Sequence, residues 1–80
     1  MENRERYDKA FRSAFELDED SDLSELRYQS IDDWDSIGHM ALMSELEDAF
    51  GISIKTEDLI QFESYIQGTE ILGRYSIEIK

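Results

Sequence analysis

Residues 35–50, DSIGHMALMSELEDAF, decide how the rest of the chain can fold. Apolar residues recur in this stretch at helical spacing, about 100° per residue. One broad side of the predicted helix carries His39, Leu42, Met43, Leu46, Ala49 and Phe50. Asp35 or Ser36 is the predicted N-cap, and Gly51 is the predicted stop. We therefore expect a helix over residues 36–50 whose apolar side is covered by the rest of the chain.

The opposite side of this helix carries a second, smaller apolar patch. It comprises Ile37, Met40, Ala41 and Ser44, flanked by the acids Glu45, Glu47 and Asp48. An apolar centre with a charged rim offers a partner protein both burial and register. Alternatively, the preceding loop covers the patch, and Ile37 or Met40 is then buried. Burying one such side chain contributes roughly 1.5–3 kcal/mol, so an exposed patch would support transient association.

Before this helix, the sequence predicts one further helix and a long loop. Residues 2–16 form the helix, with one apolar face made of Tyr7, Ala10, Phe11, Ala14 and Phe15. Residues 17–35 are polar and acidic, and their apolar residues are irregularly spaced: Leu23, Leu26, Tyr28, Ile31 and Trp34. We interpret this segment as a loop pinned to the core by isolated anchors, with Trp34 as a lid over the bundle.

After the central helix, the sequence predicts two shorter helices and a tail. Residues 56–61 form a short helix that Thr56 would cap, with Leu59 and Ile60 pointing inward. Ser64 and Gln67 have capping-box spacing and open a helix over residues 64–73. Its expected inward residues are Tyr65, Ile66, Thr69 and Leu72. Residues 74–80 alternate like a strand without a partner, which indicates a frayed or loosely packed tail.

These elements predict an all-α fold in one domain over residues 1–80. It is a small four-helix bundle of three main helices and one short helix, with a long loop between the first two. The chain contains no proline, and nothing in its pattern requires a sheet.

Composition excludes several classes of function. The 80 residues contain 20 Asp and Glu against 8 Lys and Arg, a net charge of -12, and the excess lies in residues 17–80. This charge disfavours nucleic acid and anionic membranes and favours basic protein partners. With no cysteine and one histidine, a thiolate nucleophile or a zinc site is hard to build, so we do not expect an enzyme. No signal peptide or membrane span is evident, and we expect a cytoplasmic monomer.

Two acidic clusters and the single histidine are candidate metal or catalytic sites. Asp18, Asp20 and Asp22 have the opening spacing of a calcium loop, but Leu23 and Gln29 stand where glycine and glutamate are needed. Asp32, Asp33 and Asp35 would hold a divalent ion only loosely. A solvated acidic loop accounts better for both clusters. His39 is more simply a half-buried core histidine than a ligand or a base.

Ser36 is the candidate of greatest interest. At the start of a helix, free N–H groups and the positive end of the dipole point outward and would stabilise an attached phosphate. No residue nearby is placed to deprotonate the hydroxyl, so a reacting Ser36 would be a substrate for another protein. Asp-Ser before an apolar run is, in most proteins, only a helix cap, and that interpretation stays open on these two residues alone.

The stretch WDSIGHMALMSELEDAFGISI, residues 34–54, resembles the acyl carrier protein family. Asp35, Ser36 and Ile37 stand at the family's Asp-Ser-Leu motif, and the likeness extends over residues 28–72. The resemblance implies that a separate transferase with Mg²⁺ attaches phosphopantetheine from coenzyme A to Ser36. The thiol of that arm would then carry an acyl group as a thioester, of the fatty-acid or polyketide kind. It also implies that Ile37, Met40, Glu47 and Asp48 face partner enzymes that load and process the acyl group.

Departures from the family pattern bear on the cargo and the partners. Ser44 stands where the family often has a larger apolar residue, and Ala41 where it often has a further acid, which disfavours the usual fatty-acid synthase partners. Trp34, Gly38 and His39 resemble stand-alone carriers of specialised pathways. Peptidyl carriers usually have glycines before the motif aspartate, where this chain has Asp33 and Trp34. We therefore rank an acyl cargo above an aminoacyl or peptidyl one. The remaining alternative is an unmodified acidic interaction domain with a carrier fold.

Overall fold

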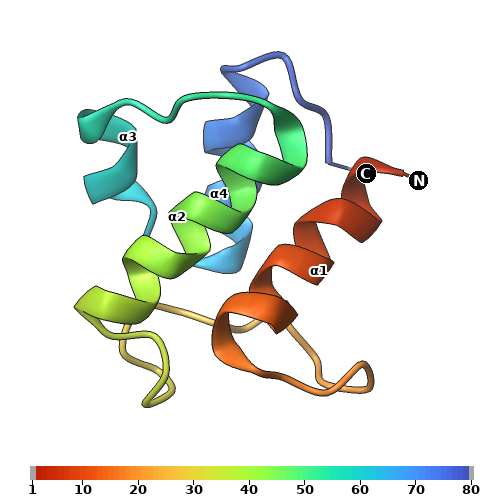
Figure 1. The fold of residues 1–80 in the computed structure, drawn as a ribbon, viewed down its shortest axis with the longest axis vertical. Helices are drawn as coiled ribbons and strands as arrows, with labels where there is room; N and C mark the ends of the chain where they lie inside the picture. Colours follow the sequence, from red (N-terminus) through yellow and green to blue (C-terminus); the bar gives the residue numbers. More distant parts are fainter. Residues whose placement is uncertain (1, 80) are drawn as a thin grey trace.

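The computed structural model describes residues 2–79, which form four helices joined by loops (Figure 1). The helices are α1 (Asn3–Phe15), α2 (Ser36–Phe50), α3 (Thr56–Gln61) and α4 (Tyr65–Gly73). Residues 2–79 contain no strand, and Arg27 and Ser64 form a single isolated antiparallel bridge. The predicted all-α class and the long loop between α1 and α2 are confirmed, and each helix ends within one residue of its predicted bounds.

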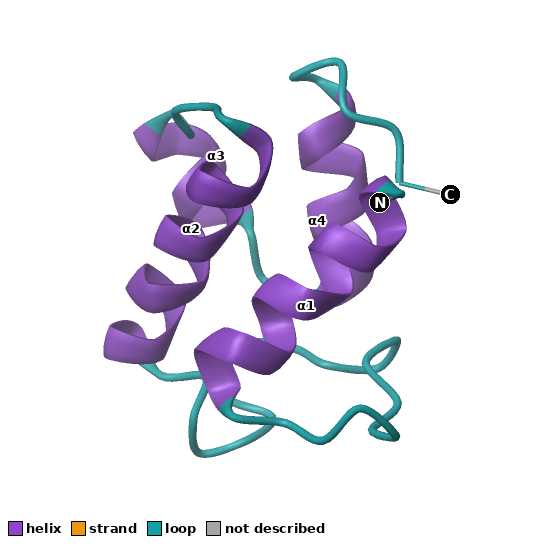
Figure 2. Ribbon diagram, turned by 45° about the vertical axis from the view of Figure 1, so that its right-hand side comes forward, coloured by secondary structure: helices purple, strands orange, loops and turns teal. Residues whose placement is uncertain are grey.

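α1 and α2 pack side by side, and α4 lies behind them in both views (Figures 1 and 2). α3 stands at the far edge, beside α2, and the long loop closes one end of the bundle. None of the described helices is both long enough and apolar enough to cross a bilayer.

An aromatic cluster centred on α1 fills the core. Phe11 is fully buried, and five rings surround it at centroid distances of 5.0–6.2 Å: Tyr7, Phe15, Trp34, Phe62 and Tyr65. α2 contributes Leu42, Met43 and Leu46, as its apolar side predicts. Because rings from α1, the loop and the α3–α4 segment meet at Phe11, this one residue joins most of the chain.

Both ends of α2 and the start of α4 follow local chemistry, whereas the starts of α1 and α3 have no side-chain cap. The Asp35 carboxylate accepts a hydrogen bond from the Gly38 amide at 2.8 Å, and the Ser64 hydroxyl accepts one from Gln67 at 3.0 Å. Gly51 ends α2 with a φ of 64°, in the left-handed region. The predicted Thr56 cap is wrong, because Thr56 is already helical and Lys55 is the N-cap, without a side-chain bond.

The predicted inward faces of α3 and α4 are partly wrong. Ile60 and Ile66 are 67% and 60% exposed, and Thr69 is only half-buried. On α3 the inward position belongs to Asp58, whose carboxylate accepts bonds from Arg74 at 2.7 Å and from the Tyr75 hydroxyl at 2.6 Å. These bonds turn the helix so that Ile60 faces out.

On α4, the inward face is set by a close approach at Gly68. A Cβ atom there would lie 2.1 Å from the Tyr7 hydroxyl oxygen and 2.2 Å from the Phe62 ring. Gly68, Ile71 and Leu72 therefore face the core, and Ile66 lies on the outer side of the helix.

The segment after α4 is packed, so the predicted loose tail is wrong for residues 74–79. Ile77 is buried in the core, and the Tyr75 hydroxyl accepts a bond from the Lys55 amide at 2.9 Å. Near the chain's other end, the Asn3 side-chain amide donates to the Glu78 carbonyl at 3.1 Å. The alternating pattern of this segment reflects burial of isolated apolar residues without strand pairing. Lys80 lies outside the described residues.

Candidate modification site at the start of α2

Ser36 is the first residue of α2, and its side chain is exposed. Asp35 accepts two of the first amides of the helix: its carboxylate binds Gly38 N–H, and its carbonyl binds His39 N–H at 2.8 Å. The amides of Ser36 and Ile37 have no acceptor within the helix. Two N–H donors and the positive end of the helix dipole therefore lie beside an accessible hydroxyl.

Tyr28 also belongs to the Ser36 site, although the sequence did not predict it there. Its hydroxyl lies 3.1 Å from Ser36 Oγ, within hydrogen-bond distance. From the sequence, Tyr28 is only one of the apolar anchors of the loop. The seven residues between the two positions carry no periodic signal, so only the folded loop brings them together.

His39 lies behind Ser36 with both ring nitrogens engaged. Trp34 Nε1–H donates to His39 Nδ1 at 3.0 Å, and His39 Nε2 is 2.8 Å from the Leu59 carbonyl oxygen. An indole N–H only donates and a carbonyl only accepts, so both bonds require the neutral ring with its proton on Nε2. The predicted half-buried core histidine is confirmed, and no lone pair on its ring is free to serve Ser36 as a base.

Trp34 and Gly38 hold the loop against the start of α2. Trp34 is fully buried, with its ring 5.2 Å from Phe15, so it is part of the core and more than the predicted lid. A Cβ atom on Gly38 would lie 1.8 Å from the Asp33 carbonyl oxygen. Glycine at this position therefore allows the loop backbone to run directly against the first turn of α2, next to Ser36.

The patch predicted on α2 is exposed and continues onto α3. Ile37 and Met40 are 81% and 53% exposed, so the alternative in which the loop buries one of them is wrong. A groove of about 360 Å³ begins at Ser36 and runs between α2 and α3. Its lining residues are Tyr28, Ser36, His39, Met40, Leu59, Ile60, Phe62 and Glu63. Exposed Ile60 borders this α2–α3 groove and extends the apolar surface around Ser36.

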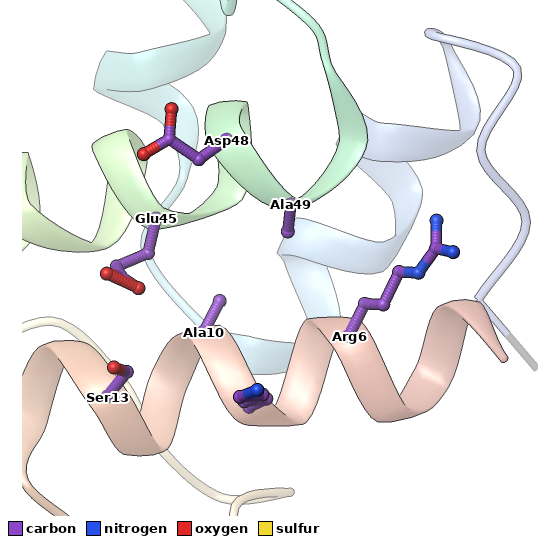
Figure 3. A pocket seen from close by; sticks show the side chains of 7 residues that line it. Arg6, Ala10, Ser13, Glu45, Asp48 and Ala49 are labelled. Atoms are coloured by element: carbon purple, nitrogen blue, oxygen red, sulfur yellow. The ribbon is translucent and has the colours of Figure 1, made fainter. Parts of the chain in front are cut away.

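The acids predicted to rim the patch have different surroundings. Glu47 is half-buried, and its carboxylate accepts a bond from the Ile54 amide at 2.7 Å, so it holds the link between α2 and α3. Asp48 is exposed and borders a hollow of about 360 Å³ between α1 and α2 (Figure 3). That hollow also has Arg6 and Lys9 from α1 in its lining, so its charge is mixed.

Acids nearer Ser36 belong to the loop. Asp32, Asp33 and Asp35 are all exposed. Within residues 2–79, no three acidic or histidine side chains converge as a metal site would require. In the first acidic cluster, Asp22 accepts bonds from the Ser24 hydroxyl at 2.7 Å and the Ser24 amide at 3.0 Å, and these bonds lower the pKa of its carboxyl. Asp22 thus closes a local turn.

Comparison with known proteins finds no family model, no curated protein and no solved structure that matches this chain.

Proposed function

We propose that this protein is an acyl carrier protein, which carries acyl groups as thioesters on a phosphopantetheine arm attached to Ser36. The observation that carries the proposal is the setting of Ser36. Its hydroxyl is exposed at the first residue of a capped helix, beside two free amides, within an Asp-Ser-Ile motif. A serine in that setting is accessible to another protein and can hold a phosphate once modified.

The residues around Ser36 fit the attached group. The free amides of Ser36 and Ile37 suit the phosphate, and the apolar walls of the α2–α3 groove lie directly beside the attachment point. When bound, phosphopantetheine supplies the terminal thiol that forms the thioester. The absence of cysteine from the chain is then no obstacle to a thiol-based function.

The chain presents the serine but does not activate it. His39 has both nitrogens engaged, and the Asp35 carboxylate faces the Gly38 amide. A phosphopantetheinyl transferase must therefore bring the base and Mg²⁺. Ser36 Oγ forms a bond to the β-phosphorus of coenzyme A as the bond from that phosphorus to adenosine 3′,5′-bisphosphate breaks. The serine proton passes to the base of the transferase.

Partner enzymes would dock around Ser36. The exposed side chains of Ile37 and Met40 on α2 and Ile60 on α3 provide the apolar contact. The loop acids Asp32 and Asp33, with Asp48 further along α2, provide negative charge for basic docking surfaces. Glu47 contributes charge as well, but its bond to Ile54 also gives it a structural role.

Intact-mass measurement tests the proposal. The purified chain is incubated with coenzyme A, Mg²⁺ and a broad-specificity transferase, and we expect the mass to increase by one phosphopantetheine group. Ser36→Ala should abolish the increase. Ser53→Ala is the matched control, because Ser53 is an exposed serine outside α2 and its apolar patch, and its loss should leave the increase intact.

Lack of any mass gain, or a gain that survives Ser36→Ala, would overturn the carrier function. The exposed apolar surface of Ile37, Met40 and Ile60 would then favour the unmodified interaction domain. If the chain is modified, loading by acyl-transferring or by aminoacyl-transferring enzymes distinguishes an acyl carrier from an aminoacyl or peptidyl carrier.

A further inference from the structure

We infer that Tyr28 is a positioning residue of the Ser36 site: its hydroxyl orients the serine before modification and donates a hydrogen bond to the phosphodiester afterwards. This inference rests on the proposed function, and it assigns part of the site to the loop instead of to α2. It starts from the 3.1 Å contact between the Tyr28 hydroxyl and Ser36 Oγ.

The backbone of Tyr28 is fixed independently of Ser36. Its amide donates to the Glu63 carbonyl at 2.7 Å, and the Tyr65 amide donates back to the Leu26 carbonyl at 3.0 Å. These two bonds flank the isolated bridge between Arg27 and Ser64. The loop backbone around Tyr28 is thus hydrogen-bonded to the segment before α4. The position of Tyr28 therefore does not depend on its contact with Ser36.

The ring of Tyr28 is fixed as well. It meets the His39 ring edge to face at a centroid distance of 5.7 Å. His39 is itself held from both sides, by Trp34 and by the Leu59 carbonyl. The His39 ring on one side and the hydrogen-bonded backbone on the other restrict the Tyr28 ring to few conformations. Its hydroxyl is consequently presented to Ser36 without much loss of conformational freedom.

The hydroxyl of Tyr28 is available for this role. Among residues 2–79, Ser36 Oγ is its only hydrogen-bond partner, whereas the hydroxyls of Tyr7, Tyr65 and Tyr75 are bound to carbonyl or carboxylate groups elsewhere. A phenol O–H both donates and accepts, so either oxygen can supply the proton in the unmodified site. If Tyr28 donates, the serine proton is left free for the base of a visiting transferase.

Esterification leaves Tyr28 as the only possible donor of the pair. The serine oxygen then has no proton, so Tyr28 O–H must point toward that oxygen or toward the adjacent anionic phosphate oxygens. A hydrogen bond to a charged acceptor is stronger than one between two neutral hydroxyls. Together with the Ile37 amide, Tyr28 would hold the phosphate from the loop side of the helix end.

Tyr28→Phe tests the inference, because it removes the hydroxyl and keeps the ring against His39. With the transferase and coenzyme A, we expect the variant to reach full modification, but with kcat/KM about threefold to tenfold lower, the effect of one exposed hydrogen bond. The ³¹P resonance of the modified variant should also shift from that of the modified wild type. A residue that only supported the fold would not move this resonance.

Tyr65→Phe is the matched control. It removes a hydroxyl bound to Asp8 on α1, away from the α2–α3 groove, so it should lower stability while leaving the rate and the ³¹P resonance unchanged. If Tyr28→Phe matches wild type in both rate and resonance, the inference is overturned and the carrier function stands. If wild type itself gains no mass, both are overturned.

Discussion

Glycine at position 38 controls how closely the loop approaches Ser36. The Asp33 carbonyl oxygen occupies the space in which a Cβ atom would lie, at 1.8 Å, and the Phe15 ring lies 3.3 Å from the same point. Neither contact can give way without moving backbone or a buried ring. Only glycine therefore fits at position 38 without moving the loop away from Ser36, although Gly38 has no reactive side chain.

Gly38→Ala should therefore destabilise the protein by about 1–3 kcal/mol, as overpacking does in cores. Denaturant unfolding measures the loss, and amide chemical shifts of residues 33–36 should change. Gly73→Ala is the control, because nothing lies within 4 Å of its Cβ position, and it should be neutral or slightly stabilising. Equal stability of the two variants would show that the loop backbone is not closely packed against Gly38.

At the scale of the elements, the end of the chain holds α3 in place. Asp58 is the one buried acid of residues 2–79, and both of its carboxylate oxygens are bound, one by Arg74 and one by Tyr75. α3 has six residues, too few to be stable alone. The orientation of Ile60 beside the α2–α3 groove thus depends on residues that follow α4.

Asp58→Asn should weaken this attachment. An amide keeps one acceptor oxygen but loses the charge and one acceptor, and we expect a loss of roughly 1–2 kcal/mol, since Arg74 is largely exposed. Thermal unfolding measures the loss of stability. The rate of amide hydrogen exchange should increase most in α3. Glu57→Gln, at an exposed position of the same helix, should change neither.

A buried tyrosine pair joins α1 to α4 and makes stability sensitive to alkaline pH. Burial first, and then its hydrogen bond to Asp8, raise the pKa of Tyr65 from 10.0 to about 12. Burial, followed by the charges of Tyr65 and Asp8, raises the pKa of Tyr7 as well. The folded state therefore favours the protonated phenols, and their contribution is fully present below pH 10.

Stability should consequently fall as the pH rises from 10 through about 12. Tyr65→Phe has no phenol to ionise at that position, so its stability should fall less steeply over the same range, although it starts lower without the Asp8 bond. Urea unfolding across this range, compared between wild type and variant, measures the difference. Parallel curves would contradict the role of Tyr65.

For the whole molecule, the dominant property is charge. A net charge of -12 on 80 residues should speed association with basic partners, and salt should screen that attraction. The structure shows at which of the two acids Glu47 and Asp48 the charge can be reversed without removing a structural hydrogen bond. Asp48 has an exposed side chain, whereas reversing Glu47 would also remove the acceptor of the Ile54 amide.

We expect kcat/KM of the transferase for this protein to fall with added salt, and Asp48→Lys to lower it about twofold to tenfold by slowing association. Glu70→Lys makes the same charge change on an exposed position of α4 and should have a smaller effect. Steady-state kinetics at two salt concentrations measure both. If the two variants are equal, net charge alone steers association and Asp48 is not part of the docking surface.

The helices were predictable from sequence because their signals are local. Apolar spacing, the Asp35 and Ser64 caps and Gly51 act within a few residues of where they stand. The contact of Tyr28 with Ser36, the inward turn of Asp58 and the packing of Ile77 were not predictable. Each depends on contact with a segment that is distant in the sequence. Tyr28 is fixed by its bond to Glu63, Asp58 by its bond to Arg74, and Ile77 by packing in the core.

The burial of Trp34 has a practical consequence. It is the single tryptophan of the chain, it stacks at 6.2 Å on His39, and it stands two residues before Ser36. Its fluorescence is therefore an intrinsic optical probe of one loop, undiluted by other indoles. A partner that pulls the loop from α2 would expose the ring to water and shift its emission to the red while the helices stay intact. Emission and circular dichroism recorded together would separate local opening from global unfolding, without any label near the serine.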